Sequence, residues 1–349
     1  MKAAVWYGRK DIRVEEREER PLRDHDVKVR VAWAGICGSD LHEYEEGPVF
    51  VPAENPDPLT GDTAPFAFGH EFAGIVEEVG SHVTRFKKGD RVAINPTLTF
   101  GNKPEDVDPY DGFSFIGLNT DGGFAKFANI PEANVYALPE PLTLQDGALV
   151  EPTAVAVQAV KEGGLLFGDS VAIFGAGPIG LLTIIAAKAA GATNIIALDL
   201  SETRLQKAKE MGATHVINSG ETNPVKAIFD IVPDGVDVSF EVAGVAPTFE
   251  QSIAATKPRG TMVIVSIFAR PIEWNPFQLT TKGVNITSSI AYTPTSFQQT
   301  IDLMATGQLK PQDIITDHIQ LDNIVDKGFE TLSNDKTQAK ILVELSGEN

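Results

Sequence analysis

A chain of 349 residues is too long for one ordinary hydrophobic core, so its length predicts two domains. Acidic side chains outnumber basic ones by 48 to 29, and the net charge of −19 argues against nucleic acid or an anionic membrane as a partner. No apolar run reaches the roughly 18 residues that span a bilayer. One cysteine cannot form an internal disulfide, which favours a reducing, cytoplasmic location.

The first 95 residues favour short strands, because β-branched residues alternate there with polar ones between Gly and Pro turns. A short helix is expected at residues 39–44, with Ser39 as its N-cap. Residues 95–120 are expected to form a loop, and a pair of strands follows it. The expected strands are residues 3–6, 12–16, 27–34, 72–79, 91–94, 124–128 and 134–137.

The pattern changes from residue 144 onward. Residues 144–160 favour a helix that carries Glu151, and short apolar strands then alternate with helical segments. This alternation predicts a parallel, doubly wound sheet. The tail leaves the repeat and is expected to return to the N-terminal domain. The expected strands are residues 171–174, 195–198, 216–217, 236–240, 262–267, 284–288 and 340–344; the expected helices are residues 179–190, 202–211, 248–256, 297–305 and 323–332.

A glycine-rich turn joins the first strand of this repeat to a helix. Gly175, Gly177 and Gly180 form a G-x-G-x-x-G pattern, with Pro178 and Ile179 between the last two glycines. The glycines permit a tight turn, close approach of a pyrophosphate and close packing of helix on strand. Because the N–H groups at a helix N-terminus favour phosphates, the turn predicts a dinucleotide site.

Asp199 ends the next strand, nineteen residues after Gly180, where a carboxylate would accept hydrogen bonds from the adenosine ribose. It would also repel a 2′-phosphate, which favours NAD over NADP. Arg204 could lie along the adenine, which weakens the preference for NAD over NADP. Alternatively, the glycines only end a strand and Asp199 is a solvated strand end. Strand, helix and acid together favour the cofactor site.

Side chains that bind zinc occur in three separate segments: Cys37, then His70 and Glu71, then Glu151. Each of these residues could instead have a purely structural role. A lone cysteine is usually a small buried hydrophobe, and a lone histidine is usually a hydrogen-bonded core residue. Glu71 could be a strand residue, and Glu151 could simply favour a helix N-terminus. Taken together they predict a catalytic zinc site whose ligands the fold must assemble.

Several motifs carry a family resemblance: Cys-Gly-Ser-Asp-Leu-His at residues 37–42, Gly-His-Glu at 69–71, Gly-Asp-Arg-Val at 89–92, Glu-Pro at 151–152, and the glycine-rich turn. With these motifs the chain resembles the zinc-dependent medium-chain alcohol and polyol dehydrogenases from end to end. Residues 35–50 resemble, more narrowly, the 2,3-butanediol (acetoin) dehydrogenases. The resemblance implies an α/β fold, with a GroES-like β-rich catalytic domain (residues 1–155 and 295–349) interrupted by a Rossmann NAD-binding domain (residues 156–294).

The implied reaction is the NAD- and zinc-dependent interconversion of acetoin and 2,3-butanediol, with R stereochemistry at the reacting carbon. Cys37, His70 and a glutamate would hold zinc, which acts as a Lewis acid on the alcohol, while NAD accepts the hydride. Either Glu71 or Glu151 could ligate zinc. We favour Glu151 as the ligand and Glu71 as an exchanging or indirect partner that belongs to the catalytic set.

The resemblance also implies a proton path. Ser39 would take the hydroxyl proton and pass it, through the nicotinamide ribose, to His42 and solvent. Histidine suits the last step because its ordinary pKa is near neutrality.

The chain departs from the family in one respect. Relatives commonly carry four closely spaced cysteines for a second, structural zinc just after the Gly-Asp-Arg-Val strand. Residues 95–120 contain no cysteine, and Asp106, Asp108 and Asp111 favour a solvated loop instead. We therefore expect one catalytic zinc and no structural zinc.

Two alternatives remain open. One is a sorbitol- or xylitol-type polyol dehydrogenase, although the apolar segment at residues 48–52 would favour a short substrate if it lines the site. The other is an NAD-binding sensor without chemistry, which the presence of Cys37, Ser39, His42, His70 and Glu151 disfavours. A homodimer or homotetramer, formed through residues 284–288, is a further expectation from the family.

Overall fold

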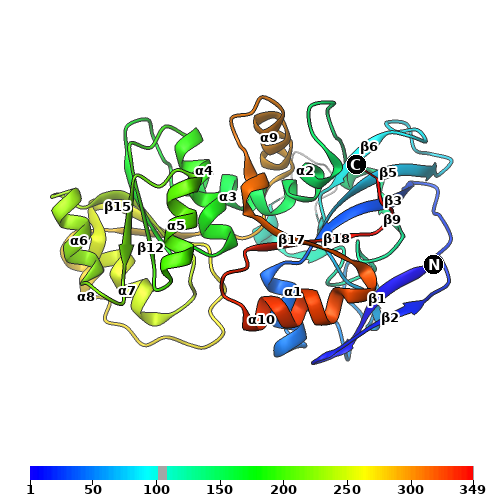
Figure 1. Ribbon diagram of the computed structural model, residues 1–349, viewed down its shortest axis with the longest axis horizontal. Helices are drawn as coiled ribbons and strands as arrows, with labels where there is room; N and C mark the ends of the chain where they lie inside the picture. Colours follow the sequence, from blue (N-terminus) through cyan, green and yellow to red (C-terminus); the bar gives the residue numbers. More distant parts are fainter. Residues whose placement is uncertain (101–107, 349) are drawn as a thin grey trace. The chain divides into compact units, whose positions relative to one another are not determined.

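The computed structural model describes residues 1–100 and 108–348, and the chain divides into two compact units (Figure 1). The first unit comprises Met1–Pro152, Thr293–Gly307 and Ile315–Asn349. The second comprises Thr153–Tyr292 and Gln308–Ile314. Asp106, one of the acids expected in a solvated loop, lies outside the described residues. No helix among the described residues is long and apolar enough to cross a membrane.

The main sheet of the first unit has the strand order β10-β6-β5-β3-β18-β17, and β9 also pairs with β3. Strands β2, β1 and β4 form a second sheet, and β7 pairs with β8. The strands are β1 (Lys2–Gly8), β2 (Asp11–Glu16), β3 (Asp26–Gly35), β4 (Phe66–Ala67), β5 (Glu71–Val79), β6 (Arg91–Ile94), β7 (Thr97–Thr99), β8 (Phe113–Phe115), β9 (Phe127–Pro131), β10 (Val135–Ala137), β17 (Ile315–Gln320) and β18 (Lys340–Glu344).

The tail of the chain completes this sheet. Strand β18 runs antiparallel to β3, and β17 runs parallel to β18 (Figure 1). Gly35 of β3 is opposite Glu71 on one side and Leu342 on the other. The ends of β3, β5 and β18 therefore meet at one place. The helices of this unit are α1 (Gly38–Glu45), α2 (Leu144–Ala148), α9 (Pro294–Ala305) and α10 (Glu330–Asn334), and α3 (Val150–Glu162) begins in it.

The second unit is a parallel sheet with the order β13-β12-β11-β14-β15-β16. This is the order of a Rossmann fold, in which the chain starts at the middle and winds outward in both directions. Helices α4 and α5 contact each other, as do α6 and α7. The elements are β11 (Ser170–Phe174), α4 (Pro178–Ala189), β12 (Asn194–Asp199), α5 (Glu202–Met211), β13 (His215–Asn218), α6 (Pro224–Ile231), β14 (Val236–Glu241), α7 (Ala246–Ala255), β15 (Thr256–Ile264), α8 (Phe277–Lys282) and β16 (Asn285–Ser288).

Four local predictions were wrong. Residues 95–120 were expected to form a loop, but β7 and β8 in this range pair antiparallel. Cys37, not Ser39, is the N-cap of α1, and Asp40 accepts a 2.9 Å hydrogen bond from the Cys37 N–H in a capping box. The strands β9 and β10 do not pair with each other, because the turn Glu132–Asn134 leads the chain from β3 across to β6. The helix expected at residues 144–160 is two helices. Pro152 would clash with the carbonyl of Ala148 in a continuous helix, so α2 ends at Ala148 and α3 begins at Val150.

Candidate active site

Cys37, His70 and Glu71 come together where strands β3 and β5 meet. Cys37 follows β3 by two residues, and His70 immediately precedes β5. One ligand atom from each residue lies within 4.8 Å of the others. His70 and Glu71 are buried, whereas Cys37 is half-buried. The pairing of two strands thus brings together residues that are more than thirty positions apart in the sequence.

The His70 ring is held on both sides by residues of α1. Its Nε2 lies 3.2 Å from Oγ of Ser39, and its Nδ1 lies 3.2 Å from Oδ1 of the fully buried Asp40. Burial lowers the pKa of His70, but the charges of Asp40 and Cys37 outweigh it and hold that pKa well above its usual value. Asp40 therefore orients the ring so that Nε2 faces Ser39.

Glu71 is clamped by a lysine from the end of the chain. Nζ of Lys340, at the start of β18, lies 2.6 Å from both Glu71 oxygens and donates a 3.1 Å hydrogen bond to the Ile36 carbonyl. Burial lowers the pKa of Lys340, but the Glu71 charge, with smaller contributions from Cys37 and Glu151, raises it above its usual value.

Gly35 makes room for this pair. A Cβ at this position would lie 2.1 Å from Oε2 of Glu71, so only glycine leaves space for the carboxylate.

The other residues expected at the site lie on neighbouring helices. Glu151 is buried in the first turn of α3, and its charge acts on Lys340. Among the described residues, the metal-binding group contains Glu71 rather than Glu151. Ser39 and His42 both lie on α1, three residues apart and so on one face of the helix.

These residues suit a zinc ion. Thiolate, imidazole and carboxylate are the ligands that catalytic zinc takes in proteins, and three protein ligands leave a position open for a substrate. The histidine also has the carboxylate partner that commonly fixes the ring of a metal-binding histidine. No other group of three such side chains occurs in the described parts of the chain. Two of the acids expected to be solvated, Asp108 and Asp111, are exposed, and Asp108 caps a short turn by accepting from the Tyr110 N–H.

The glycine-rich turn of the second unit connects β11 to α4. Gly175 has φ +115°, which favours glycine, and a Cβ at Gly180 would lie 2.0 Å from the Gly175 carbonyl oxygen. Gly177 is the N-cap of α4 and has open space around its Cα. Pro178 and Ile179 form the first turn of that helix. The turn therefore has the form that a pyrophosphate needs.

Asp199, at the end of β12, holds this turn in place. Its Oδ2 accepts from the Ala176 N–H at 2.9 Å, and its Oδ1 accepts from the N–H groups of Leu200 and Ser201. Nη1 of Arg204 lies 3.7 Å from the same carboxylate. Asp199 thus links the ends of two neighbouring strands, where dinucleotides bind in this fold.

Comparison with known proteins agrees with both halves of this arrangement. Residues 23–140 match the family model "Alcohol dehydrogenase GroES-like domain", and residues 178–306 match "Zinc-binding dehydrogenase". The chain is 43% identical to "(R,R)-butanediol dehydrogenase" of Bacillus subtilis (strain 168), over 98% of this chain and 99% of the relative. This chain is a zinc-binding medium-chain alcohol dehydrogenase.

Two further comparisons bear on the fold and on specificity. The crystal structure of 2R,3R-butanediol dehydrogenase from Bacillus subtilis aligns with this dehydrogenase at a TM-score of 0.93 and 43% identity, covering 98% of this chain and 99% of the other. "Sorbitol dehydrogenase" of Bacillus subtilis (strain 168) is 33% identical over 98% of this chain and 97% of the relative. The expected fold, a GroES-like unit with a Rossmann unit, is confirmed, and the family binds zinc and a nicotinamide cofactor.

The sequence analysis missed several residues of the dehydrogenase's sites. Lys340 carried a weak signal, since a lysine opens an otherwise apolar strand. Asp40 could have been found from its position three residues after an N-cap. Leu200, Val245 and Ile267 follow the ends of β12, β14 and β15 and are exposed apolar residues. Such residues at the carboxyl ends of parallel strands are candidates for the wall of a cofactor site.

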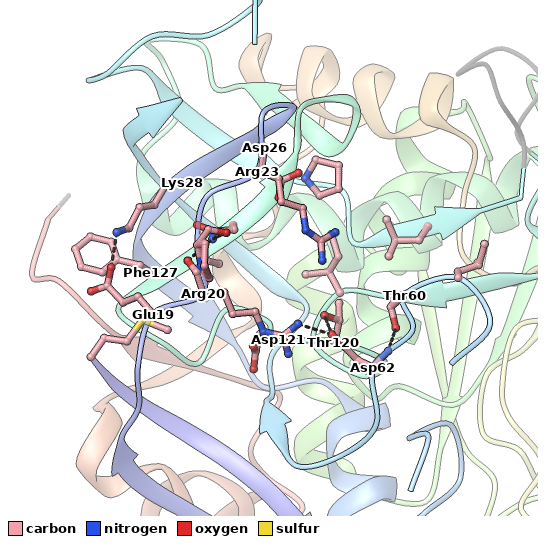
Figure 2. Close-up of a pocket in the computed structure, with 18 residues that line it drawn as sticks. Glu19, Arg20, Arg23, Asp26, Lys28, Thr60, Asp62, Thr120, Asp121 and Phe127 are labelled. Atoms are coloured by element: carbon pink, nitrogen blue, oxygen red, sulfur yellow. Dashed lines mark hydrogen bonds and ion pairs between the residues drawn. The ribbon is translucent and has the colours of Figure 1, made fainter. Parts of the chain in front are cut away.

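A separate cavity of about 410 Å³ lies elsewhere in the first unit (Figure 2). Arg20 lines it and pairs with Asp62 at 2.7 Å and with Asp121 at 2.5 Å. Arg23 and Lys28 also line the cavity. None of the predicted site residues belongs to it, and Arg20 is already paired with two carboxylates, so we assign no function to it.

Proposed function

We propose that this dehydrogenase interconverts acetoin and 2,3-butanediol, with R configuration at the reacting carbon and NAD as the hydride acceptor. One observation carries the proposal: a thiolate, an imidazole and a carboxylate converge in a chain that is 43% identical to a butanediol dehydrogenase over nearly its full length. The donor set supports alcohol chemistry, and the similarity supports the substrate.

Cys37 and His70 would hold the zinc together with a glutamate. The ion supplies Lewis acidity, which lowers the pKa of a secondary alcohol. Glu71 lies with Cys37 and His70 but is bound by Lys340 through both oxygens, so it favours an exchanging role. We keep Glu151, buried nearby, as the proposed third ligand.

Ser39 would accept the hydroxyl proton of the substrate. Its Oγ is within hydrogen-bond reach of His70, so it lies beside the metal-binding group. His42 is half-buried on the same face of α1 and would release the proton to solvent. The route between them passes through the ribose of NAD in this proposal.

The second unit would bind NAD through its glycine-rich turn and Asp199. The carboxylate of Asp199 already accepts three backbone N–H groups, and a negative charge there disfavours a 2′-phosphate. Arg204 beside it would lie along the adenine. The single cysteine of the chain, free in the structure, supports a location in the reducing cytoplasm.

We also propose a homodimer or homotetramer. Strand β16 is an edge of the six-stranded sheet, so one side of its backbone is available for pairing with a second copy. Light scattering of the purified protein tests this, and a monomer at micromolar concentration would contradict it.

A substrate panel tests the proposed reaction. NADH oxidation is measured with acetoin, diacetyl, fructose and xylulose, and we expect kcat/KM to be highest for acetoin. The butanediol products are then resolved by chiral chromatography, with the R centre expected at the reduced carbon. Much better turnover of fructose or xylulose than of acetoin would reject the butanediol assignment.

A polyol dehydrogenase is the second candidate, favoured by the 33% identity to a sorbitol dehydrogenase. A long polyol needs several polar partners in its pocket. Against this, Val49 and Phe50 present apolar side chains on the surface of the first unit. The same panel separates the two candidates.

A further inference from the structure

Helix α1 carries a second buried carboxylate, which the proposed mechanism does not use. Glu43 is fully buried one turn after Ser39. A buried carboxylate is unfavourable unless donors satisfy it. Among the described residues, no lysine, arginine or histidine lies within ion-pair distance of Glu43, so its oxygens depend on neutral donors.

Those donors come from one short segment of backbone. The N–H of Val49 donates to Oε2 at 2.9 Å, while the N–H groups of Phe50 and Val51 both donate to Oε1, the latter at 3.2 Å. Gly47 permits the chain to turn around the carboxylate, because a Cβ there would lie 2.5 Å from Oε2 of Glu43. One side chain therefore fixes three consecutive residues.

The segment presents apolar side chains to solvent. Val49 is 51% exposed and Phe50 is 37% exposed, whereas Val51 is buried. Burial of these two side chains does not hold the segment in place, since both are exposed. The hydrogen bonds to Glu43 fix the backbone that displays them.

The segment is also linked to the metal-binding group. The Phe50 carbonyl accepts a 3.1 Å hydrogen bond from Nδ2 of Asn119, and Oδ1 of Asn119 accepts from the Phe115 N–H at 2.8 Å. The Phe115 ring meets the His70 ring edge to face, with 5.9 Å between centroids. Asn119 thus joins the segment to a residue that packs on a proposed zinc ligand.

We propose that Glu43 is a positioning residue that holds Val49 and Phe50 as an apolar wall beside the metal-binding group. Such a wall accommodates a methyl group and disfavours hydroxyl groups, which would lose water without gaining partners. Glu43 therefore sets the preference for a short ketone over a polyhydroxylated one. This inference rests on the proposed alcohol chemistry at that group.

Glu43→Gln tests the role, with Glu46→Gln as the matched control. Both glutamates lie at the end of α1, but Glu46 is exposed. The amide NH2 that replaces one carboxylate oxygen cannot accept from a backbone N–H. We therefore expect hydrogen exchange of the peptide containing residues 49–51 to accelerate about tenfold in the full-length, zinc-loaded enzyme. The control should exchange as the unsubstituted enzyme does.

Steady-state kinetics provide the second measurement. For Glu43→Gln we expect KM for acetoin to rise about tenfold, with kcat changed by less than about threefold and KM for NADH unchanged. The ratio of kcat/KM for acetoin to kcat/KM for fructose should fall. Unchanged exchange would overturn the proposal, and so would faster exchange with unchanged KM, because the carboxylate would then only support the fold.

A second variant covers the case in which Glu43→Gln does not fold. Asn119→Ala leaves Glu43 intact but removes the link between Phe50 and Phe115, and we expect the same rise in KM. An unchanged KM in Asn119→Ala would contradict the proposal that Val49 and Phe50 form an apolar wall. If the unsubstituted enzyme does not reduce acetoin, the proposed reaction fails. The KM comparison is then made with the ketone that it reduces best, so the two proposals are judged separately.

Discussion

Lys340 and Glu71 form the most buried ion pair of the candidate site, across 269 positions of sequence. Both side chains are almost inaccessible to solvent. Such a pair contributes little compared with a well-packed apolar pair, but removing one partner leaves an uncompensated buried charge. The pair also lies at the edge of the metal-binding group, where a carboxylate can exchange between a lysine and a metal.

We predict that Lys340→Met destabilises the metal-free protein by about 3–5 kcal/mol, because Glu71 loses its buried partner. Denaturant unfolding measures the loss, with the exposed Lys336→Met as control. Added zinc should restore part of the stability by binding the freed carboxylate. Equal stability of Lys340→Met and the control would show that the pair does not support the site.

Cys37 is the one thiolate that the chain offers to a metal. We expect Cys37→Ser to lose zinc and turnover while NADH still binds to the second unit, because the glycine-rich turn lies in a separate unit. Elemental analysis and NADH fluorescence titration measure the two effects. Full zinc and full turnover in this variant would overturn the ligand assignment.

At the scale of elements, one carboxylate connects the starts of two strands in the second unit. Asp237 of β14 accepts a 2.8 Å hydrogen bond from the N–H of Ser170, the first residue of β11, and pairs with Lys257. Burial raises the pKa of Asp237, but Lys257 and the Ser170 N–H outweigh it, so the pKa lies below its usual value. Asp237 thus stabilises the sheet while it is ionised.

The pH dependence follows from that direction. A carboxylate whose pKa is lower in the folded state stabilises the protein above its unfolded pKa, about 3.9, and this contribution is lost as the pH falls through the folded pKa. We predict that Asp237→Asn lowers Tm at pH 7 and that the difference shrinks toward pH 3. Asp230→Asn, which removes an exposed pair on α6, should change Tm little at either pH. A difference that stays constant with pH would contradict the role of the charge.

At the scale of the whole molecule, the metal content follows from the distribution of ligands. The described residues contain one group of three metal-binding side chains, and residues 95–120 contain no cysteine. We predict about one zinc per chain in the purified protein. Plasma mass spectrometry measures it, and two zinc ions per chain would reveal a second site.

Local pattern predicted much of the fold. The alternation of strands and helices located all six strands of the Rossmann sheet, and turn glycines located the start of α4. Other features depend on the tertiary structure. Whether β9 pairs with β3 or with β10 depends on which neighbour completes the sheet. Strand β17 is largely exposed, so its sequence lacks a clear alternation of apolar and polar residues. The Lys340–Glu71 contact depends on strand register between distant segments, which periodicity does not contain.

The return of the tail to the first sheet also orders events during synthesis. The second unit's sheet has its last strand when Ser288 has been made, so it can form while the chain is still on the ribosome. Lys340 is made 269 residues after Glu71, so a nascent chain holds Cys37 and His70 long before their neighbour gains its lysine. In that interval Glu71 lacks the lysine that binds both of its oxygens. The Glu71–Lys340 pair can therefore form only once the last strand of the chain has been made.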